Sequence, residues 1–216
     1  MKPSAVLLAG GRSRRMGVDK ATLLISGEPL WKRQLRVLSN LRPDAVWISA
    51  QTVPSWCPAE IEVVTDKPPS CGPLSGVVAG LLRLESSHLL VLAIDLPQMT
   101  PEHLRKLWGL ARPGTGVIPF HGDYFEPLCA IYPVEALVAA ETALSSGDVS
   151  LQHFAQNLLR ESQAKVYELA SEERPLYLNM NTPSDLPERI VISGQVAEFT
   201  KVSRMAGSSR RLRAWS

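Results

Sequence analysis

Residues 7–20 read Leu-Leu-Ala-Gly-Gly-Arg-Ser-Arg-Arg-Met-Gly-Val-Asp-Lys, and the first of them complete a short apolar run, 5–8. Such a run, followed by helix-like sequence, predicts a buried parallel strand. A glycine-rich turn at the carboxyl end of a parallel strand is where open α/β sheets bind ligands. Glycines also let backbone N–H groups approach phosphate oxygens closely. The segment therefore predicts an α/β fold and a phosphate-binding loop together.

The loop is strongly basic. Four cations follow the glycines within nine residues: Arg12, Arg14, Arg15 and Lys20. This density of positive charge suits a triphosphate. A Walker A loop is excluded because the span from Gly11 to Gly17 is one residue too long and Val18 follows, and G-x-G-x-x-G is absent. The alternative, a solvated basic loop, accounts less well for the glycine pair, the cations and the strand together.

Strand-like and helix-like segments alternate along the chain. Short runs rich in Val, Ile and Leu predict strands at 5–8, 45–49, 61–64, 89–94, 117–120, 128–132 and 164–169. Amphipathic stretches predict helices at 29–41, 74–84, 101–110, 134–145 and 150–160. The first of these helices has Lys32, Arg33 and Arg36 on its polar side. We predict a doubly wound, mostly parallel, Rossmann-like α/β sheet with a small antiparallel excursion in the second half.

Length and composition fit one globular domain. The 216 residues are 45% hydrophobic and 20% charged, which is enough to build a core. The longest apolar run, Leu89 to Ile94, is far below the roughly 18 residues of a membrane span, and the N-terminal run is too short for a signal peptide. The three cysteines and four histidines show no metal-ligand spacing. We predict a cytoplasmic protein with isolated thiols and no membrane partner.

Positive charge gathers at the C-terminus. Residues 199–216 carry +5 and no acid, and because the whole chain carries +2, residues 1–198 carry −3. The basic pI therefore belongs to the tail and does not indicate a nucleic-acid-binding domain. We predict a domain over 1–193 and a flexible basic tail over 194–216. The tail is either dispensable or attracts an anionic substrate or an acidic partner enzyme.

The motifs together resemble a known family. Residues 7–20 are similar to the signature L-A-G-G-x-S-x-R-M-G-x-D-K of nucleotidyltransferases in molybdenum cofactor and sugar-nucleotide synthesis, and most resemble the molybdenum cofactor guanylyltransferases. Four further segments match in order: 25–30 (ISGEPL), 72–76 (GPLSG, with serine for the usual alanine), 95–97 (DLP) and 179–183 (NMNTP). The resemblance covers about residues 4–190. Five motifs in order make it specific.

The resemblance implies a role for individual residues. It implies that the nucleotide is bound by Leu8, Ala9, Gly10, Gly11, Lys20, Asp66 and Asp95. It implies Mg²⁺ on Asp95, catalysis by Arg15, Lys20 and Asp95, and acceptor binding by Asn179 and Asn181. Each has a structural alternative: Asp95 could cap the helix after Pro97, Asp66 could cap a turn, and the asparagines could form an Asx turn. Ser49-Ala50-Gln51 departs from the asparagine that family members often carry there.

The implied reaction is transfer of GMP from GTP to molybdopterin, with a molybdoenzyme or another cofactor-biosynthesis protein as a further partner. Members that use purines tend to carry L-A-G-G, as at Gly10, whereas cytidylyltransferases carry L-A-A-G. Glycine there leaves room for the larger base. The alternatives are a related enzyme with another base or acceptor, such as molybdopterin cytidylyltransferase or a sugar-phosphate nucleotidyltransferase, and a catalytically silent nucleotide-binding module.

Overall fold

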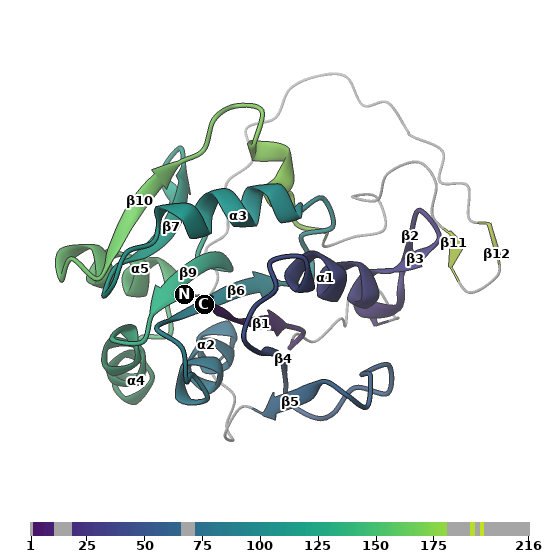
Figure 1. Ribbon diagram of the computed structural model, residues 1–216, viewed down its shortest axis with the longest axis horizontal. Coiled ribbons are helices and arrows are strands. Elements are labelled where there is room, and N and C mark those ends of the chain that lie inside the picture. Colours follow the sequence, from purple (N-terminus) through teal and green to yellow (C-terminus); the bar gives the residue numbers. More distant parts are fainter. Residues whose placement is uncertain (1, 11–18, 66–71, 181–190, 193–194, 197–216) are drawn as a thin grey trace.

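The computed structural model describes residues 2–10, 19–65, 72–180, 191–192 and 195–196. Its centre is an eight-stranded sheet of order β10-β7-β9-β6-β1-β4-β5, in which β8 pairs with β7 (Figure 1). The strands are β1 (Ser4–Leu8), β4 (Val46–Ala50), β5 (Glu62–Thr65), β6 (His88–Ala93), β7 (Gly116–His121), β8 (Tyr124–Phe125), β9 (Cys129–Pro133) and β10 (Ala164–Glu168). All seven strands predicted from the sequence are present, each shifted by no more than a residue or two.

The sheet is mostly parallel. The neighbours β5, β4, β1 and β6 run parallel, as do β7 and β10. The strand β9 lies between β6 and β7 and is antiparallel to both. The predicted antiparallel excursion is therefore confirmed, and it lies inside the sheet. It starts at the turn after β7, where Gly122 has a φ of +64°, a conformation that glycine adopts without strain.

Helices cover both faces of the sheet. They are α1 (Leu30–Ser39), α2 (Pro73–Leu82), α3 (Pro101–Leu110), α4 (Ala136–Ser146) and α5 (Leu151–Arg160). Alternate residues of β1 point to opposite faces: Ala5 and Leu7 pack with α1 and α3, whereas Val6 and Leu8 pack with α2. Figure 1 shows α1 and α3 on one side of the sheet and α2 and α4 on the other.

The helix α2 approaches the sheet unusually closely. A Cβ built on Gly76 would lie 2.5 Å from Ser49 Oγ and 2.8 Å from Leu8 Cδ2. Another residue at this position would therefore require the Ser49 and Leu8 side chains to shift. The second glycine of the 72–76 motif therefore lies at a close contact between the helix and the sheet.

Short elements connect the layers at the end of the sheet where β1 and β6 finish. The single turn η1 (Lys20–Thr22) leads into a hairpin of β2 (Leu24–Ile25) and β3 (Glu28–Pro29), and η2 (Arg174–Tyr177) follows β10. A second small hairpin joins β11 (Val191–Ile192) and β12 (Gln195–Val196). The turn of the first hairpin has positive φ at both Ser26 and Gly27, as tight two-residue hairpins require.

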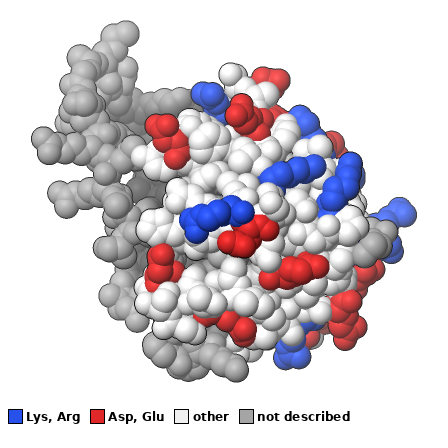
Figure 2. All heavy atoms as spheres, turned by 90° about the vertical axis from the view of Figure 1, so that its left-hand side faces the viewer, with Lys and Arg blue, Asp and Glu red and all other residues white. Residues whose placement is uncertain are grey.

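Figure 2 displays the face of the molecule at the β10 edge of the sheet. Acidic and basic side chains are interspersed over this face, at the β10 edge of the sheet (Figure 2). Within the described residues, no helix is long and apolar enough to cross a bilayer.

Candidate active site

Three chain segments leave the sheet side by side at the carboxyl ends of β1, β4 and β6. The N–H of Ala9 donates to the Ser49 carbonyl at 2.9 Å, and the N–H of Ile94 donates to the Leu8 carbonyl at 3.1 Å. Leu8, Ala9 and Gly10 thus lie at the edge where the sequence predicts them. This edge is the general location of ligand sites in open α/β sheets.

Gly10 is exposed. Among the described residues, a Cβ built there would meet nothing nearer than the Ser49 carbonyl oxygen, at 4.0 Å, which is an ordinary contact. Its φ is not in the left-handed region. The fold of the described residues therefore does not require glycine at this position, and the missing side chain leaves free space beside the strand end.

Lys20 and Asp95 face each other across this edge. Lys20 Nζ lies 3.8 Å from Asp95 Oδ2, and the two side chains are 17% and 25% exposed. Burial raises the pKa of the Asp95 carboxyl above its ordinary value, while the charge of Lys20 opposes that shift. The distance is long for a hydrogen-bonded ion pair. The two groups are therefore opposite charges that lie close together without forming a tight ion pair.

Lys20 is held through its neighbour, Asp19. One carboxylate oxygen of Asp19 accepts from the Ala21 N–H at 3.0 Å and caps η1, and the other accepts from Trp56 Nε1 at 2.8 Å. Trp56 in turn stacks on Trp31, with ring centroids 5.7 Å apart. Neither aromatic carries a sequence pattern that indicates this role, because the contact joins segments distant along the chain.

The loop that carries Asp95 is clamped by α1. Gln34 is fully buried, and its Nε2 donates to the carbonyl of Leu96 at 2.7 Å. Arg33 Nε donates to the carbonyl of Pro97, also at 2.7 Å. Buried polar contacts of this kind fix backbone geometry because breaking them leaves unpaired groups. Both residues position Asp95 without touching its carboxylate, and the sequence alone did not identify this function.

The alternative role for Asp95, a cap on the following helix, is wrong. The N-cap of α3 is Thr100, whose hydroxyl accepts from the His103 N–H at 3.3 Å. This agrees with the prediction that the helix begins at Pro101. Asp95 lies five residues before that cap, directly beyond β6, and its carboxylate points toward Lys20 at the sheet edge.

Asn179 reaches the same edge from the C-terminal side. The N–H of Met180 donates to the Asp95 carbonyl at 2.9 Å, which places Asn179 next to the Asp95 backbone. The segment is anchored at Tyr177, whose hydroxyl lies 2.6 Å from His103 Nε2. Burial lowers the pKa of His103, with the nearby Glu173 carboxylate opposing that shift. A neutral imidazole can then accept from the Tyr177 hydroxyl and donate to Glu173, 3.4 Å away.

A further carboxyl lies on the turn before β9. Burial raises the pKa of Glu126 to about 7. The turn borders the end of β6, because the Ala93 N–H donates to the Leu128 carbonyl at 2.7 Å. Among the described residues, no side chain pairs with the Glu126 carboxyl. Sequence reasoning did not single out this residue, since a lone glutamate after a short hairpin carries no pattern.

Four predicted site residues lie outside the described part of the chain: Gly11, Arg15, Asp66 and Asn181. Among the described ones, Lys20, Asp95 and Asn179 come from segments 75 and more residues apart in the sequence. Their roles stay predictions.

Solved structures with this architecture define the class. The molybdopterin-guanine dinucleotide biosynthesis protein A of Archaeoglobus fulgidus matches with a TM-score of 0.66 and 26% identity, over 84% of this chain and 94% of that one. A nucleotidyl transferase of Methanothermobacter matches with a TM-score of 0.67 at 20% identity, over 85% and 94% of the two chains. The fold is that of a nucleotidyltransferase.

Sequence comparison identifies the family. The profile of the MobA-like NTP transferase domain matches residues 5–165. A "Probable molybdenum cofactor guanylyltransferase" of Opitutus terrae is 39% identical over 185 residues, which cover 84% of this chain and 92% of that protein. A protein of the same name from Pelotomaculum thermopropionicum is 32% identical over 218 residues, covering 100% of this chain and 98% of the relative. The chain belongs to the MobA-like NTP transferase family.

Proposed function

We propose that the chain transfers GMP from GTP to the phosphate of molybdopterin, forming the guanine dinucleotide cofactor and releasing pyrophosphate. The observation that carries the proposal is the Lys20–Asp95 pair at the carboxyl edge of the sheet, in a chain whose relatives are named guanylyltransferases. GTP would lie on the side of β1 and β4, and the acceptor on the side of Asn179.

The chemistry needs no covalent intermediate. An oxygen of the acceptor phosphate attacks the α-phosphorus of GTP, and the bond to the bridging oxygen breaks with its electron pair leaving on pyrophosphate. A phosphate monoester is already a competent nucleophile, so catalysis consists of aligning two anions and neutralising the leaving group. The backbone at Gly10 and Gly11 would hold the phosphates, and Arg15 and Lys20 would stabilise pyrophosphate. Asp66 would contact the nucleotide, and Asn181 would act with Asn179 on the acceptor.

Asp95 fits a Mg²⁺ ion. Its carboxylate is a hard oxygen donor and is partly exposed, and the Lys20 ammonium lies 3.8 Å away. No cluster of three or more His, Cys, Asp or Glu side chains that could enclose a metal occurs within the described ranges. Substrate phosphates and water would therefore complete the coordination. Bound there, Mg²⁺ would neutralise phosphate charge.

Guanine specificity is supported by the space at Gly10. An alanine methyl at this position would project into the open region beside Ser49, and its absence leaves room for a purine. The departure at Ser49-Ala50-Gln51 lies at the neighbouring strand end, so nucleotide contacts there would differ from those that an asparagine could make.

Mass spectrometry of the product tests base and acceptor together. The protein is incubated with molybdopterin, Mg²⁺ and equal amounts of GTP, CTP, ATP and UTP, with the Asp95→Asn variant as control. We expect the guanine dinucleotide and one pyrophosphate per product. A cytosine dinucleotide would identify a cytidylyltransferase, and turnover only with a sugar phosphate would identify the other related class. Nucleotide binding without pyrophosphate release would indicate a silent binding module.

A further inference from the structure

A cavity of about 410 Å³ opens beside Asp95, between the β2–β3 hairpin, α1 and the segments at 97–98 and 178–179. Its polar lining comes from Ser26, Arg33, Gln98 and Asn179, and its apolar lining includes Pro97 and Leu178. Concave sites of this size, with a mixed lining and a few convergent polar groups, are typical of small-molecule binding.

The walls of the cavity share their backbone with the Asp95 loop. Pro97 lies two residues beyond Asp95 and is fixed by the Arg33 Nε hydrogen bond of 2.7 Å. Asn179 precedes Met180, whose N–H donates to the Asp95 carbonyl at 2.9 Å. A ligand that fills the cavity would therefore have one end next to the Asp95 loop. A ring system with a phosphate-bearing arm matches this arrangement.

The cavity contains hydrogen-bonding groups that the described protein does not use. Arg33 engages only its Nε, and its two terminal nitrogens have no partner among the described residues. The side-chain amides of Gln98 and Asn179 likewise have no hydrogen bond within the described segments. Groups of this kind bind a ligand without first breaking a contact within the protein.

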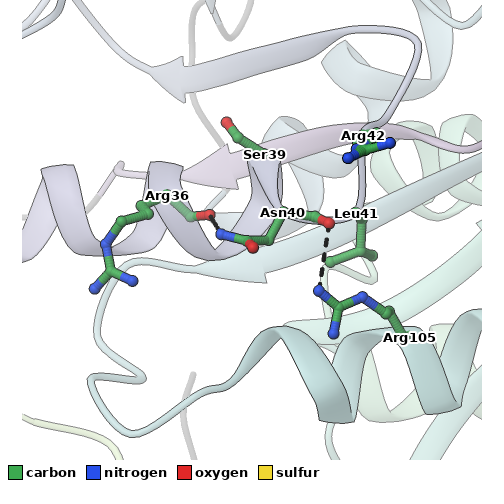
Figure 3. A pocket seen from close by; sticks show the side chains of 6 residues that line it. All are labelled: Arg36, Ser39, Asn40, Leu41, Arg42 and Arg105. Atoms are coloured by element: carbon green, nitrogen blue, oxygen red, sulfur yellow. Dashed lines mark hydrogen bonds between the residues drawn. The ribbon is translucent and has the colours of Figure 1, made fainter.

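A second hollow, at the other end of α1, provides a contrast. It has a volume of about 620 Å³ and is lined by three arginines, of which Arg36 is paired with Glu28 at 2.8 Å and Arg105 with Glu102 at 3.0 Å. In Figure 3 a dashed line also joins Arg105 to the backbone of Asn40. This hollow lies at the C-terminal end of the helix, away from the Asp95 loop, so its arginines are suitable controls.

We propose that the cavity beside Asp95 binds the pterin ring system of the acceptor, with Arg33 and Gln98 as specificity-determining residues; this rests on the proposed function. A pterin has a ring carbonyl and ring nitrogens that accept from the guanidinium and amide N–H groups, and N–H groups that donate to the amide oxygens. Pro97 and Leu178 would contact the ring faces, and the acceptor phosphate would reach Asp95.

Equilibrium dialysis with 6-hydroxymethylpterin, which lacks the phosphate, tests the subsite directly on the full chain. Gln98 is exposed and makes no hydrogen bond among the described residues, so Gln98→Ala should fold normally. We expect its dissociation constant for the pterin to rise at least about fivefold, and that of Arg33→Met at least about tenfold. Arg36→Met, which removes the same charge from the same helix, should bind the pterin as the wild type does.

Steady-state kinetics distinguish a loss of acceptor binding from a loss of acceptor positioning. With molybdopterin as acceptor, Gln98→Ala should raise KM for molybdopterin about as much as its pterin dissociation constant rises, while GTP affinity stays within about twofold. Unchanged pterin affinity and unchanged acceptor KM in Gln98→Ala and Arg33→Met would overturn the proposal. A wild type that binds the pterin through Gln98 but forms no dinucleotide would instead refute the proposed function and leave the subsite in place.

Discussion

Trp56 donates a 2.8 Å hydrogen bond to the carboxylate of Asp19, the residue that caps the turn carrying Lys20. The indole thus fixes the cationic side of the site from a segment 37 residues away. Removing the donor while keeping the ring isolates this contact. We expect Trp56→Phe to retain its packing on Trp31 and to bind GTP about three- to tenfold more weakly, corresponding to about 1 kcal/mol.

Trp108→Phe is the matched control, because the Trp108 indole N–H has no hydrogen bond among the described residues. Isothermal titration calorimetry with GTP measures the affinity of each of the two variants. If both variants bound GTP as the wild type does, the Trp56–Asp19 bond would have no part in placing Lys20.

Lys20→Ala tests the charge itself. Its ammonium faces Asp95 at 3.8 Å, and we assign it to the pyrophosphate half of GTP. We expect GTP affinity to fall at least about tenfold while GMP affinity changes little. Lys32→Ala, an exposed lysine on α1, is the control for net charge. Equal losses for GTP and GMP would show that Lys20 contacts the base or ribose, or supports the fold.

Asp95→Asn should lower turnover by at least about 10²-fold, a loss of roughly 3 kcal/mol of transition-state stabilisation. The fold should persist, because Gln34 and Arg33 hold the backbone of this loop and not its carboxylate. Steady-state kinetics with Mg²⁺ titrated to saturation, together with thermal unfolding, makes the measurement. Near wild-type turnover in saturating Mg²⁺ would remove Asp95 from the metal role.

Glu126→Gln should change how stability depends on pH. The folded state holds the Glu126 proton more tightly than the unfolded state, since burial raises the pKa from 4.5 to about 7. The ionisation of this buried group therefore has no effect on the stability of the fold below about pH 4.5. Between about pH 4.5 and pH 7 the stability falls progressively, and above about pH 7 the loss is constant. Glutamine at position 126 does not ionise, so the variant does not lose stability in this way. Relative to wild type, its unfolding free energy should rise by about 1–3 kcal/mol between pH 5 and pH 8.

Urea unfolding of both proteins at the two pH values measures this difference. Glu141→Gln, at an exposed glutamate of α4, controls for the loss of one charge. A difference between Glu126→Gln and wild type that stays the same at both pH values would contradict the assignment.

Truncation after Glu198 tests the basic tail. Exposed charges act mainly on encounter rate and are screened over about 8 Å at physiological salt. We expect GTP binding and thermal stability to be unchanged, and kcat/KM for molybdopterin to drop at low salt if the tail steers the anionic acceptor. The difference from the full chain should vanish as salt rises. A loss of stability on truncation would mean that the segment packs on the domain.

The layers of the fold were predictable because both faces of the sheet are covered, so that its parallel strands appear as continuous apolar runs. The helix α3 matches its predicted bounds because Thr100 and Pro101 are a local start signal that needs no tertiary information. Asp95 was predictable for a related reason: a charge at the end of a long apolar run must lie at the sheet edge.

The supports of the site could not be predicted, because they depend on contacts between distant segments. Gln34 and Arg33 bind carbonyls 62 and 64 residues away. Periodicity places Arg33 on the polar side of α1, which ordinarily faces solvent, yet the structure turns it onto Pro97. An amphipathic pattern distinguishes buried from exposed positions, and it contains no signal for a polar side chain that holds another loop.

Gly76 gives the third of the five motifs, residues 72–76, a structural role that its sequence does not suggest. The glycine is a spacer of minimum thickness between α2 and the ends of β1 and β4. The separation of α2 from the strand ends beside the proposed nucleotide site thus depends on the absence of a methyl group at position 76. An alanine there would press on the Ser49 and Leu8 side chains and so disturb the strand ends beside the proposed nucleotide site, even though it touches no substrate.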